Sequence, residues 1–386
     1  MDPVAFLRQC QAKYGSVFNV CLGGKTMTFF VSPKSYSVLL KHKALSHKPA
    51  FEEIAQKALD QSRAFASYTQ ALVPEVPAVH YGKLVHPHLQ HSAAVEVLIK
   101  KTLLQQRRVL STFPTQRMSL LSFVQQCIFE SGTRVLFGDT VVDHNPTLRE
   151  AFQTFDTSFP LFVAGAVKTT FPTNVVAPLD AAKESLALLW AANANSIPTA
   201  FWSLFYLLDN PVAWSTVRDE VREHLGKSID WTGDQLGKCV FLASAVDEAL
   251  RLSASSLMMR VATEDVNLNV EVLTSRCMAR FDVHALSLKG SHVHLAKGSK
   301  VMIFPSLGHF DDAIFPQPRT FDRFVQATSA QLEAFNPFGM GVTMCPGRNF
   351  AKNQVKRHRL GHSNLIDRFD RILPPTDNAI QIDLET

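Results

Sequence analysis

The sequence has little excess of charge of either sign. Its 39 basic residues nearly balance its 34 acidic residues over 386 positions, so the formal net charge at pH 7 is only +5. Proteins that bind nucleic acids usually carry a clear basic excess, and we therefore predict no nucleic-acid partner. The balance still allows a local basic patch that faces an anionic membrane or an acidic redox partner.

Cysteines are few and scattered. The six cysteines have neither the short paired spacings of a zinc site nor the density of a disulfide-stabilised fold. We therefore expect a protein that faces a reducing compartment, the cytosol. The cysteines are Cys10, Cys21, Cys127, Cys239, Cys277 and Cys345.

The N-terminus lacks both a signal peptide and a membrane span, so we expect any membrane anchor to be missing from this chain. Residues 185–208 carry no charged side chain and are long enough to cross a bilayer. Asn193, Asn195 and Pro198 lie near their centre, where a lipid-facing helix would leave polar groups unsatisfied. We predict a buried helix instead, which kinks or opens because Pro198 withholds an N–H from the carbonyl of Ala194.

What the sequence does have is a large apolar fraction. Hydrophobic residues make up 46% of the chain and aromatic residues 10%, which is ample for a sizeable core, and the apolar periodicity is mostly helical. Two short apolar runs on either side of a Gly-Gly turn predict a small β-region near the N-terminus. The predicted elements are a helix at 2–13, strands at 17–22 and 26–31, a helix at 34–42 and helices over most of 50–180.

One cysteine has an unusual setting near the C-terminal end, in Phe-Gly-Met-Gly-Val-Thr-Met-Cys-Pro-Gly at residues 338–347. A glycine-rich turn with an inert cysteine explains a bare Phe-Gly-x-Gly motif well enough. The full spacing Phe-x-x-Gly-x-x-x-Cys-x-Gly is much rarer. Its glycines let the backbone approach a flat cofactor, and backbone N–H groups can point at a thiolate that ligates iron. We therefore assign Phe338, Gly339, Gly341, Cys345 and Gly347 to cofactor binding.

This loop resembles the haem-binding loop of the cytochromes P450. The resemblance implies a b-type haem with Cys345 as its axial thiolate, which donates electron density and favours O–O cleavage. It also implies the cytochrome P450 fold, mainly α-helical with a small β-region, as one haem-thiolate catalytic domain over residues 1–386. The hairpin and helix near the N-terminus match the beginning of that fold.

The uncharged stretch resembles the long helix that crosses the distal face of the haem. The acid and threonine that the family usually has there are replaced by Ala194 and Asn195. The amino-acid sequence from Trp190 to Trp202 is similar to that of one branch of the family. This branch contains the cholesterol and oxysterol 7α-hydroxylases, the sterol 12α-hydroxylases and prostacyclin synthase. The resemblance makes Asn195 and Ser196 the expected catalytic groups of the distal side.

A Glu-x-x-Arg motif follows this stretch. Glu248 and Arg251 are three residues apart, so they lie on one face of a helix and can form an ion pair. A surface pair is the default explanation of such a motif. Its place between the distal helix and the Cys345 loop matches the buried pair of the family, which makes Arg323 the third member. We expect all three to act structurally.

The same resemblance implies further cofactor and substrate contacts. Arg260 matches the arginine that binds a haem propionate, and Lys83 or His88 matches a second basic partner. We discount a metal site among the histidines near residue 88, because no acidic residue or cysteine accompanies them. Leu257, Met258 and Phe159 are expected to line the substrate cavity, and a row of phenylalanines with helical spacing is most simply core. These phenylalanines are Phe152, Phe155, Phe159 and Phe162.

Three segments depart from the family pattern. Residues 171–180 lie where two helices of the substrate lid are expected, and residues 271–284 resemble an insertion. Residues 352–362 follow the Cys345 loop and are too polar for a helix with a proper buried face. These departures predict a fold that is incomplete in part.

The resemblance implies a sterol monooxygenase that takes electrons from NADPH through a reductase partner. We expect a monomer on the cytosolic face of the endoplasmic reticulum membrane. Two other functions stay open. One is a haem-thiolate isomerase of a lipid peroxide, similar to prostacyclin synthase, because the distal acid and threonine are missing. The other is a non-catalytic remnant, because the segment after Cys345 is so polar.

Overall fold

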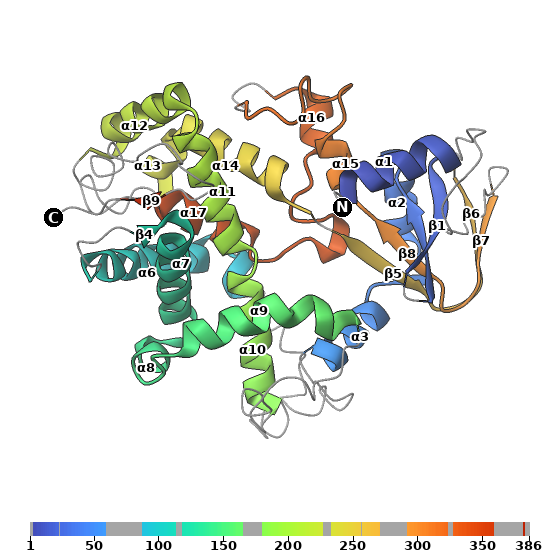
Figure 1. The fold of residues 1–386 in the computed structure, drawn as a ribbon, viewed down its shortest axis with the longest axis horizontal. Helices are drawn as coiled ribbons and strands as arrows, with labels where there is room; N and C mark the ends of the chain where they lie inside the picture. Colours follow the sequence, from blue (N-terminus) through green and yellow to red (C-terminus); the bar gives the residue numbers. More distant parts are fainter. Residues whose placement is uncertain are drawn as a thin grey trace. The chain divides into compact units, whose positions relative to one another are not determined.

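The structure, a computed structural model, is mainly helical and has a small β-region (Figure 1). The chain divides into two compact units. The first contains Met1–Ile54, Ala254–Phe321 and Gln326–Cys345, and the second contains Ala55–Ser253, Asp322–Val325 and Pro346–Thr386. The residues that the structure describes are 3–22, 24–58, 87–112, 118–164, 180–226, 233–255, 257–270, 292–322, 327–358 and 381–382.

A five-stranded sheet forms the centre of the first unit, in the order β1-β2-β8-β5-β3. Strands β2 and β8 run parallel, and the other neighbours run antiparallel. A separate hairpin is formed by β6 and β7. The strands are β1 (Val17–Leu22), β2 (Lys25–Phe30), β3 (Leu45–Ser46), β5 (Met258–Ala262), β6 (Val266–Asn269), β7 (His292–Leu295) and β8 (Lys300–Ile303).

Alternation along the first two strands places the helices on both faces of this sheet. Phe18 and Phe29 pack in a cluster with residues of helix α1 (Pro3–Tyr14). Their neighbours Val17 and Phe30 pack in another cluster with residues of helix α2 (Pro33–Lys41). Successive side chains of a strand point to opposite faces, so each helix buries one face of the hairpin. The other helices of this unit are α3 (Lys48–Ala58), which begins here, α15 (Ser306–His309) and α16 (Ser329–Ala334).

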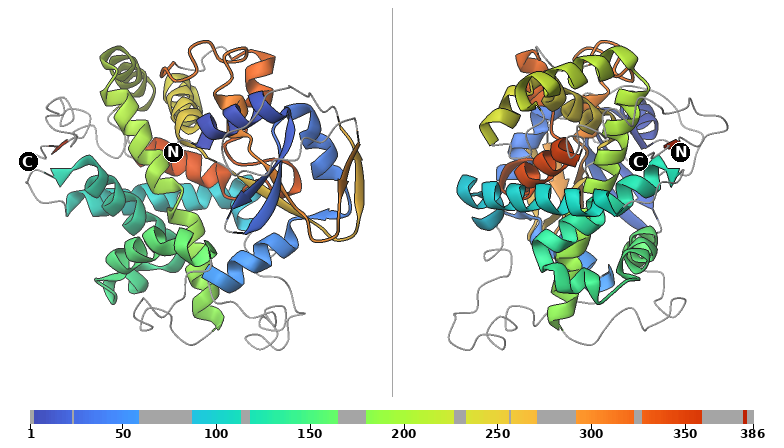
Figure 2. Two further views of the ribbon diagram at one scale, coloured as in Figure 1. Left: turned by 45° about the vertical axis from the view of Figure 1, so that its right-hand side comes forward. Right: turned by 90° about the vertical axis from the view of Figure 1, so that its left-hand side faces the viewer.

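The second unit is a helical bundle in which α6, α7, α11 and α17 pack against one another (Figure 2). Its short strands β4 (Met118–Ser119) and β9 (Gln381–Ile382) pair antiparallel. The helices are α6 (Ser92–Ser111), α7 (Leu120–Phe137), α8 (Asp139–Asp143), α9 (Leu148–Ala164), α10 (Asp180–Asn193), α11 (Ser196–Leu208), α12 (Pro211–Leu225), α13 (Gly233–Lys238), α14 (Val240–Ser253) and α17 (Arg348–His358).

The predicted hairpin and its flanking helices are confirmed to within one residue at each end. The opening predicted in the uncharged stretch is also confirmed, because α10 ends at Asn193 and α11 begins at Ser196. Pro198 is the third residue of α11, where its missing N–H would have no intrahelical partner in any case. Of the helices described, none combines the length and the apolar character needed to cross a membrane.

Residues 352–362 were predicted to be too polar for a helix with a proper buried face, and this is wrong for 352–358, the part that the structure describes. Gln354 and Val355 of this part are almost completely buried, as is Phe350 at the start of the same helix. The amide of Gln354 donates from Nε2 to the carbonyl of Ile128 over 3.4 Å, so its burial keeps a hydrogen bond. Gly132 makes room for it, since a Cβ there would lie 2.9 Å from Gln354 Nε2. A polar residue can therefore occupy the core face of α17.

The two other segments that depart from the family pattern are 171–180 and 271–284, and all of their residues except Asp180, where α10 begins, lie outside the described residues.

Candidate active site

Backbone geometry shapes the loop that carries Cys345. Gly339 and Gly341 have φ angles of 73° and 65°, in the left-handed region that other residues enter only at a cost. The backbone N–H of Cys345 donates to the carbonyl of Phe338 over 3.0 Å, which closes the loop. Cys345 and Phe338 are both half-buried, and Gly347 ends the motif just before α17. The loop therefore presents a cysteine on a backbone that is fixed by its glycines.

Arg260 ties the sheet of the first unit to this loop. It lies on β5 with only 3% of its surface exposed, and it donates to the Thr343 hydroxyl over 2.8 Å and to the Met259 carbonyl over 3.0 Å. Burial lowers the pKa of Arg260, and its positive charge contributes, after burial, to the lowered pKa of His47. No carboxylate in the described ranges pairs with Arg260. A buried cation of this kind suits an anionic partner.

Leu257 and Met258, which were both expected to contact the substrate, differ in exposure. Met258 is 7% exposed, and its Sδ would lie 3.7 Å from a Cβ added at Gly339, so it packs under the loop. Leu257 is 50% exposed. A contact with substrate stays a prediction for both residues.

The break between α10 and α11 presents two polar residues in the second unit. Asn195 is exposed and forms the N-cap of α11 without a side-chain capping bond. Its carbonyl accepts from the Thr199 N–H over 3.1 Å and from the Thr199 hydroxyl over 2.7 Å. Ser196 is 5% exposed. The preceding amide, Asn193, is buried and donates to the Leu189 carbonyl, so the two asparagines have different environments.

Glu248 and Arg251 form a two-pronged ion pair on α14. Arg251 Nε donates to Glu248 Oε2 over 2.8 Å and its NH2 to Oε1 over 2.7 Å, with 2% of each side chain exposed. The backbone N–H of Asp322 also donates to Glu248 Oε1 over 3.0 Å. Arg323, expected as the third member, lies outside the described residues. The carboxylate therefore holds a neighbouring loop as well as Arg251.

Phe159 belongs to an aromatic cluster of the second unit. Its ring stacks on Trp190 with the centroids 4.0 Å apart and meets Phe155 edge-on at 5.9 Å. The indole N–H of Trp190 donates to Asp156 Oδ1 over 2.8 Å. This bond was not anticipated from the sequence. The signal for it was the single acidic residue among the phenylalanines of α9.

Lys83 and His88 were the two candidates for a second basic residue that binds a propionate. Lys83 lies outside the described residues, and His88 is exposed. Among the residues that are described, no group of three or more His, Cys, Asp or Glu side chains is placed to hold a metal ion.

The chain is similar to known proteins over most of its length. A family model described as Cytochrome P450 matches residues 174–275 and 271–385, together more than half of the chain. Cytochrome P450 7B1 of Mus musculus is 27% identical and covers 92% of this chain and 78% of that protein. Cholesterol 7-alpha-monooxygenase of Cricetulus griseus is also 27% identical, with 92% and 81% covered. The 5-beta-cholestane-3-alpha,7-alpha-diol 12-alpha-hydroxylase of Sus scrofa is 27% identical, with 97% and 83% covered.

A solved structure, the cytochrome P450DA heme domain, has the same fold. It matches with a TM-score of 0.65 at 16% sequence identity and covers 97% of this chain and 87% of that chain. At this identity the likeness extends to the fold alone. The expectation of a mainly helical cytochrome P450 fold with a small β-region is confirmed.

Proposed function

Because this chain belongs to the cytochrome P450 family of monooxygenases, we propose that it hydroxylates cholesterol or an oxysterol at the 7α position. The observation that carries this proposal is the break at the start of α11, where Asn195 and Ser196 precede Ile197 and Pro198. The order Asn-Ser-Ile-Pro is similar to the 7α-hydroxylase group. Relatives whose names include cholesterol and cholestane support a sterol as the substrate.

The described residues fit a haem. Cys345 offers a thiolate on a loop whose glycines leave the backbone bare, and Arg260 offers a buried guanidinium that suits a propionate. Thr343 accepts a hydrogen bond from Arg260, so the arginine and the loop support each other. When bound, a thiolate-ligated haem supplies the activation of dioxygen and the insertion of one oxygen atom into a C–H bond.

Ser196 and Asn195 would deliver protons on the distal side of the haem. The overall reaction consumes the sterol, O2, NADPH and one proton, and it gives the hydroxylated sterol, water and NADP+. Forming water from the second oxygen atom requires two protons, so a hydroxyl that both accepts and donates a proton is useful. The Ser196 hydroxyl is such a group. The exposed Asn195 amide can hold a water molecule beside it.

The remaining parts of the proposal concern the surroundings of the enzyme. We propose that electrons come from NADPH through a reductase partner, and that the protein works on the endoplasmic reticulum membrane. Membership of the cytochrome P450 family supports the need for a redox partner.

A haem-thiolate isomerase of a lipid peroxide is the second candidate. Ala194 and Asn195 replace the usual acid and threonine, and an isomerase needs no delivery of protons to dioxygen. The apolar stack of Phe159 on Trp190 favours a hydrocarbon substrate over a carboxylate-bearing peroxide. A non-catalytic remnant is disfavoured, because α17 has the buried face that this alternative assumes to be missing.

Two assays on the haem-loaded protein test these functions. The first supplies the reductase, NADPH and dioxygen with cholesterol and a set of oxysterols, and we expect a 7α-hydroxylated sterol. The second supplies a prostaglandin endoperoxide without reductase. Product in the second assay alone would identify an isomerase. If the reduced protein forms no thiolate-type complex with carbon monoxide, both enzymatic functions are wrong.

A further inference from the structure

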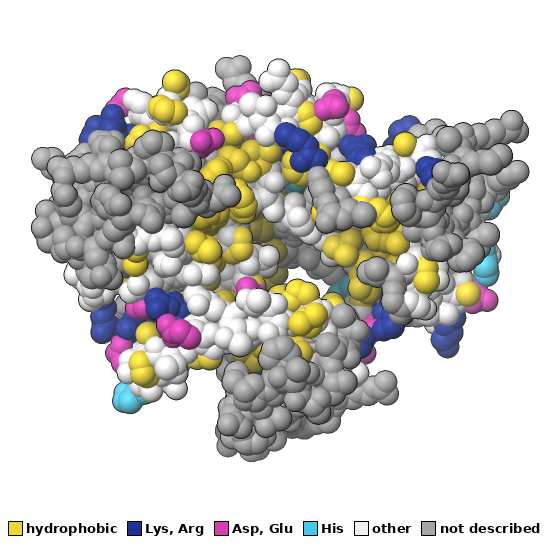
Figure 3. Space-filling view, in the orientation of Figure 1, with side chains coloured by type: hydrophobic (Ala, Val, Ile, Leu, Met, Phe, Trp, Pro, Cys, Tyr) yellow, Lys and Arg dark blue, Asp and Glu magenta, His cyan; other side chains and the backbone are white. Residues whose placement is uncertain are grey.

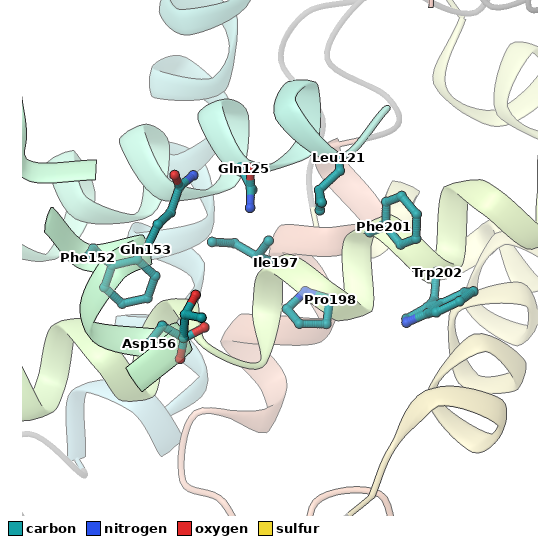
Figure 4. Close-up of a pocket in the computed structure, with 10 residues that line it drawn as sticks. Leu121, Gln125, Phe152, Gln153, Asp156, Ile197, Pro198, Phe201 and Trp202 are labelled. Carbon is teal, nitrogen blue, oxygen red and sulfur yellow. The ribbon is translucent and has the colours of Figure 1, made fainter. Parts of the chain in front are cut away.

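A surface cavity of about 230 Å³, open to solvent, lies between α7, α9 and α11 of the second unit (Figure 4). Each helix contributes side chains that recur at intervals of about one turn, so one face of each helix lines the space. The lining residues are Leu121 and Gln125 of α7, Phe152, Gln153, Asp156 and Thr157 of α9, and Ile197, Pro198, Phe201 and Trp202 of α11.

This cavity is on a different face of α11 from the proposed catalytic serine. Successive residues of an α-helix are rotated by about 100°, so Phe201 lies about 140° and Pro198 about 200° from Ser196 around the axis. Ser196 is not among the lining residues. A ligand in the cavity would therefore not occupy the place of the substrate beside Ser196.

One end of the cavity carries a negative charge. Asp156 accepts the Trp190 indole N–H at Oδ1 and is half-buried, and burial raises the pKa of its carboxyl group. No basic side chain within the described part of the chain forms an ion pair with it. The amides of Gln125 and Gln153 add hydrogen-bonding groups, and no other lining residue is charged.

The other end of the cavity is aromatic. Phe201 and Trp202 meet edge-on with their ring centroids 5.2 Å apart, and the close-up shows them at the opposite end from Asp156, with Ile197 and Pro198 between (Figure 4). Trp202 is 36% exposed. Figure 3 shows hydrophobic side chains along the course of α11 on the surface of this unit. Aromatic rings attract both other rings and organic cations.

We propose that this cavity binds a small organic cation that carries an aromatic ring, with the ammonium group at Asp156 and the ring against Phe201 and Trp202. Its volume lies below the ~300–1,000 Å³ of pockets for drug-sized molecules, so the ligand has a single ring. The Asp156 carboxylate would repel an anion, and a neutral ligand would lack the attraction between opposite charges.

The test uses the haem-loaded protein and benzyltrimethylammonium, measured by isothermal titration calorimetry at pH 8. Simple amines ligate haem iron through a lone pair, and this quaternary cation has none, so the Soret band should not move. Benzyl alcohol and benzenesulfonate serve as the neutral and anionic probes. We expect the cation to bind about tenfold more tightly than either, through the attraction between its charge and the Asp156 carboxylate, because it has no N–H to donate.

Two variants and one matched control locate the site. Asp156→Asn keeps an acceptor for the Trp190 N–H and removes the charge that attracts the cation, so binding should weaken about tenfold. Trp202→Leu should weaken it about threefold through the lost ring. Asp219→Asn removes an exposed charge from α12 and should change nothing. Equal affinity of the parent protein and Asp156→Asn, no preference for the cation, or competition with a sterol would each overturn the proposal.

Discussion

The loop that carries Cys345 and the break before α11 lie in different units and are shaped by different means. The loop depends on its backbone, with two glycines at positive φ and a hydrogen bond from the Cys345 N–H to the Phe338 carbonyl. The bundle around the break depends on side chains, such as the buried pair of Glu248 and Arg251. The first site should therefore be sensitive at its glycines, and the second at its buried polar groups.

The largest effect is expected from Glu248→Ala. Removal of this carboxylate breaks a buried ion pair of Arg251, so the free energy of unfolding should fall by about 3–5 kcal/mol. Urea titration and the haem content of the purified protein measure it. Glu52→Ala is the control, because its ion pair with Lys48 is exposed and contributes about 0.5 kcal/mol or less. Equal losses in the two variants would show that burial of the pair does not matter.

Gly341→Ala tests whether the Cys345 loop depends on the backbone angles of its glycines, and it is measured by the same urea titration and haem content. A residue with a Cβ at a φ of 65° should cost about 1–2 kcal/mol of stability, and the loop should lose haem. The control is Gly237→Ala on α13, where a Cβ meets nothing within 4 Å and alanine should stabilise the helix by about 1 kcal/mol. If both substitutions stabilise the protein, the loop does not depend on the backbone angles of its glycines.

The sequence predicted the loop better than the bundle, for a physical reason. Glycine spacing reports backbone conformation directly, and the alternation of residues 17–31 reports a hairpin, so both were found from local patterns. The core face of α17 was not found, because Gln354 fits there only beside Gly132, which is more than two hundred residues away in the chain. The Asp156–Trp190 bond was missed for the same reason. Such partners depend on tertiary packing.

Ser196→Ala tests whether the break before α11 takes part in the reaction itself. If the buried hydroxyl handles protons, the yield of hydroxylated sterol per NADPH consumed should fall about tenfold while stability changes little. Thr199→Ala is the control, since its hydroxyl already donates to the Asn195 carbonyl. A solvent isotope effect on the coupled reaction, altered in Ser196→Ala alone, separates a role in proton transfer from simple repacking. An unchanged yield contradicts the role proposed for Ser196.

The smallest effect is expected at an ion pair of the second unit whose carboxylate, on Asp143, is exposed. A hydrogen bond from Arg134 lowers the pKa of Asp143 in the folded protein below its ordinary value of 3.8. The stabilisation is therefore present above the ordinary value and is lost as the pH falls through the lowered pKa. Asp143→Asn should be slightly less stable than the parent protein at neutral pH and equal to it in strong acid. A difference that grows in acid has the wrong sign for this account.

The identity of the axial ligand is the central claim, and the spectrum of the reduced, carbon-monoxide-bound protein tests it most directly. The parent protein should give the thiolate-type spectrum, and Cys345→Ala and Cys345→His should both lose it. Cys21→Ala, which changes an exposed cysteine, is the matched control and should keep it. A thiolate-type spectrum that survives both substitutions of Cys345 would contradict the account.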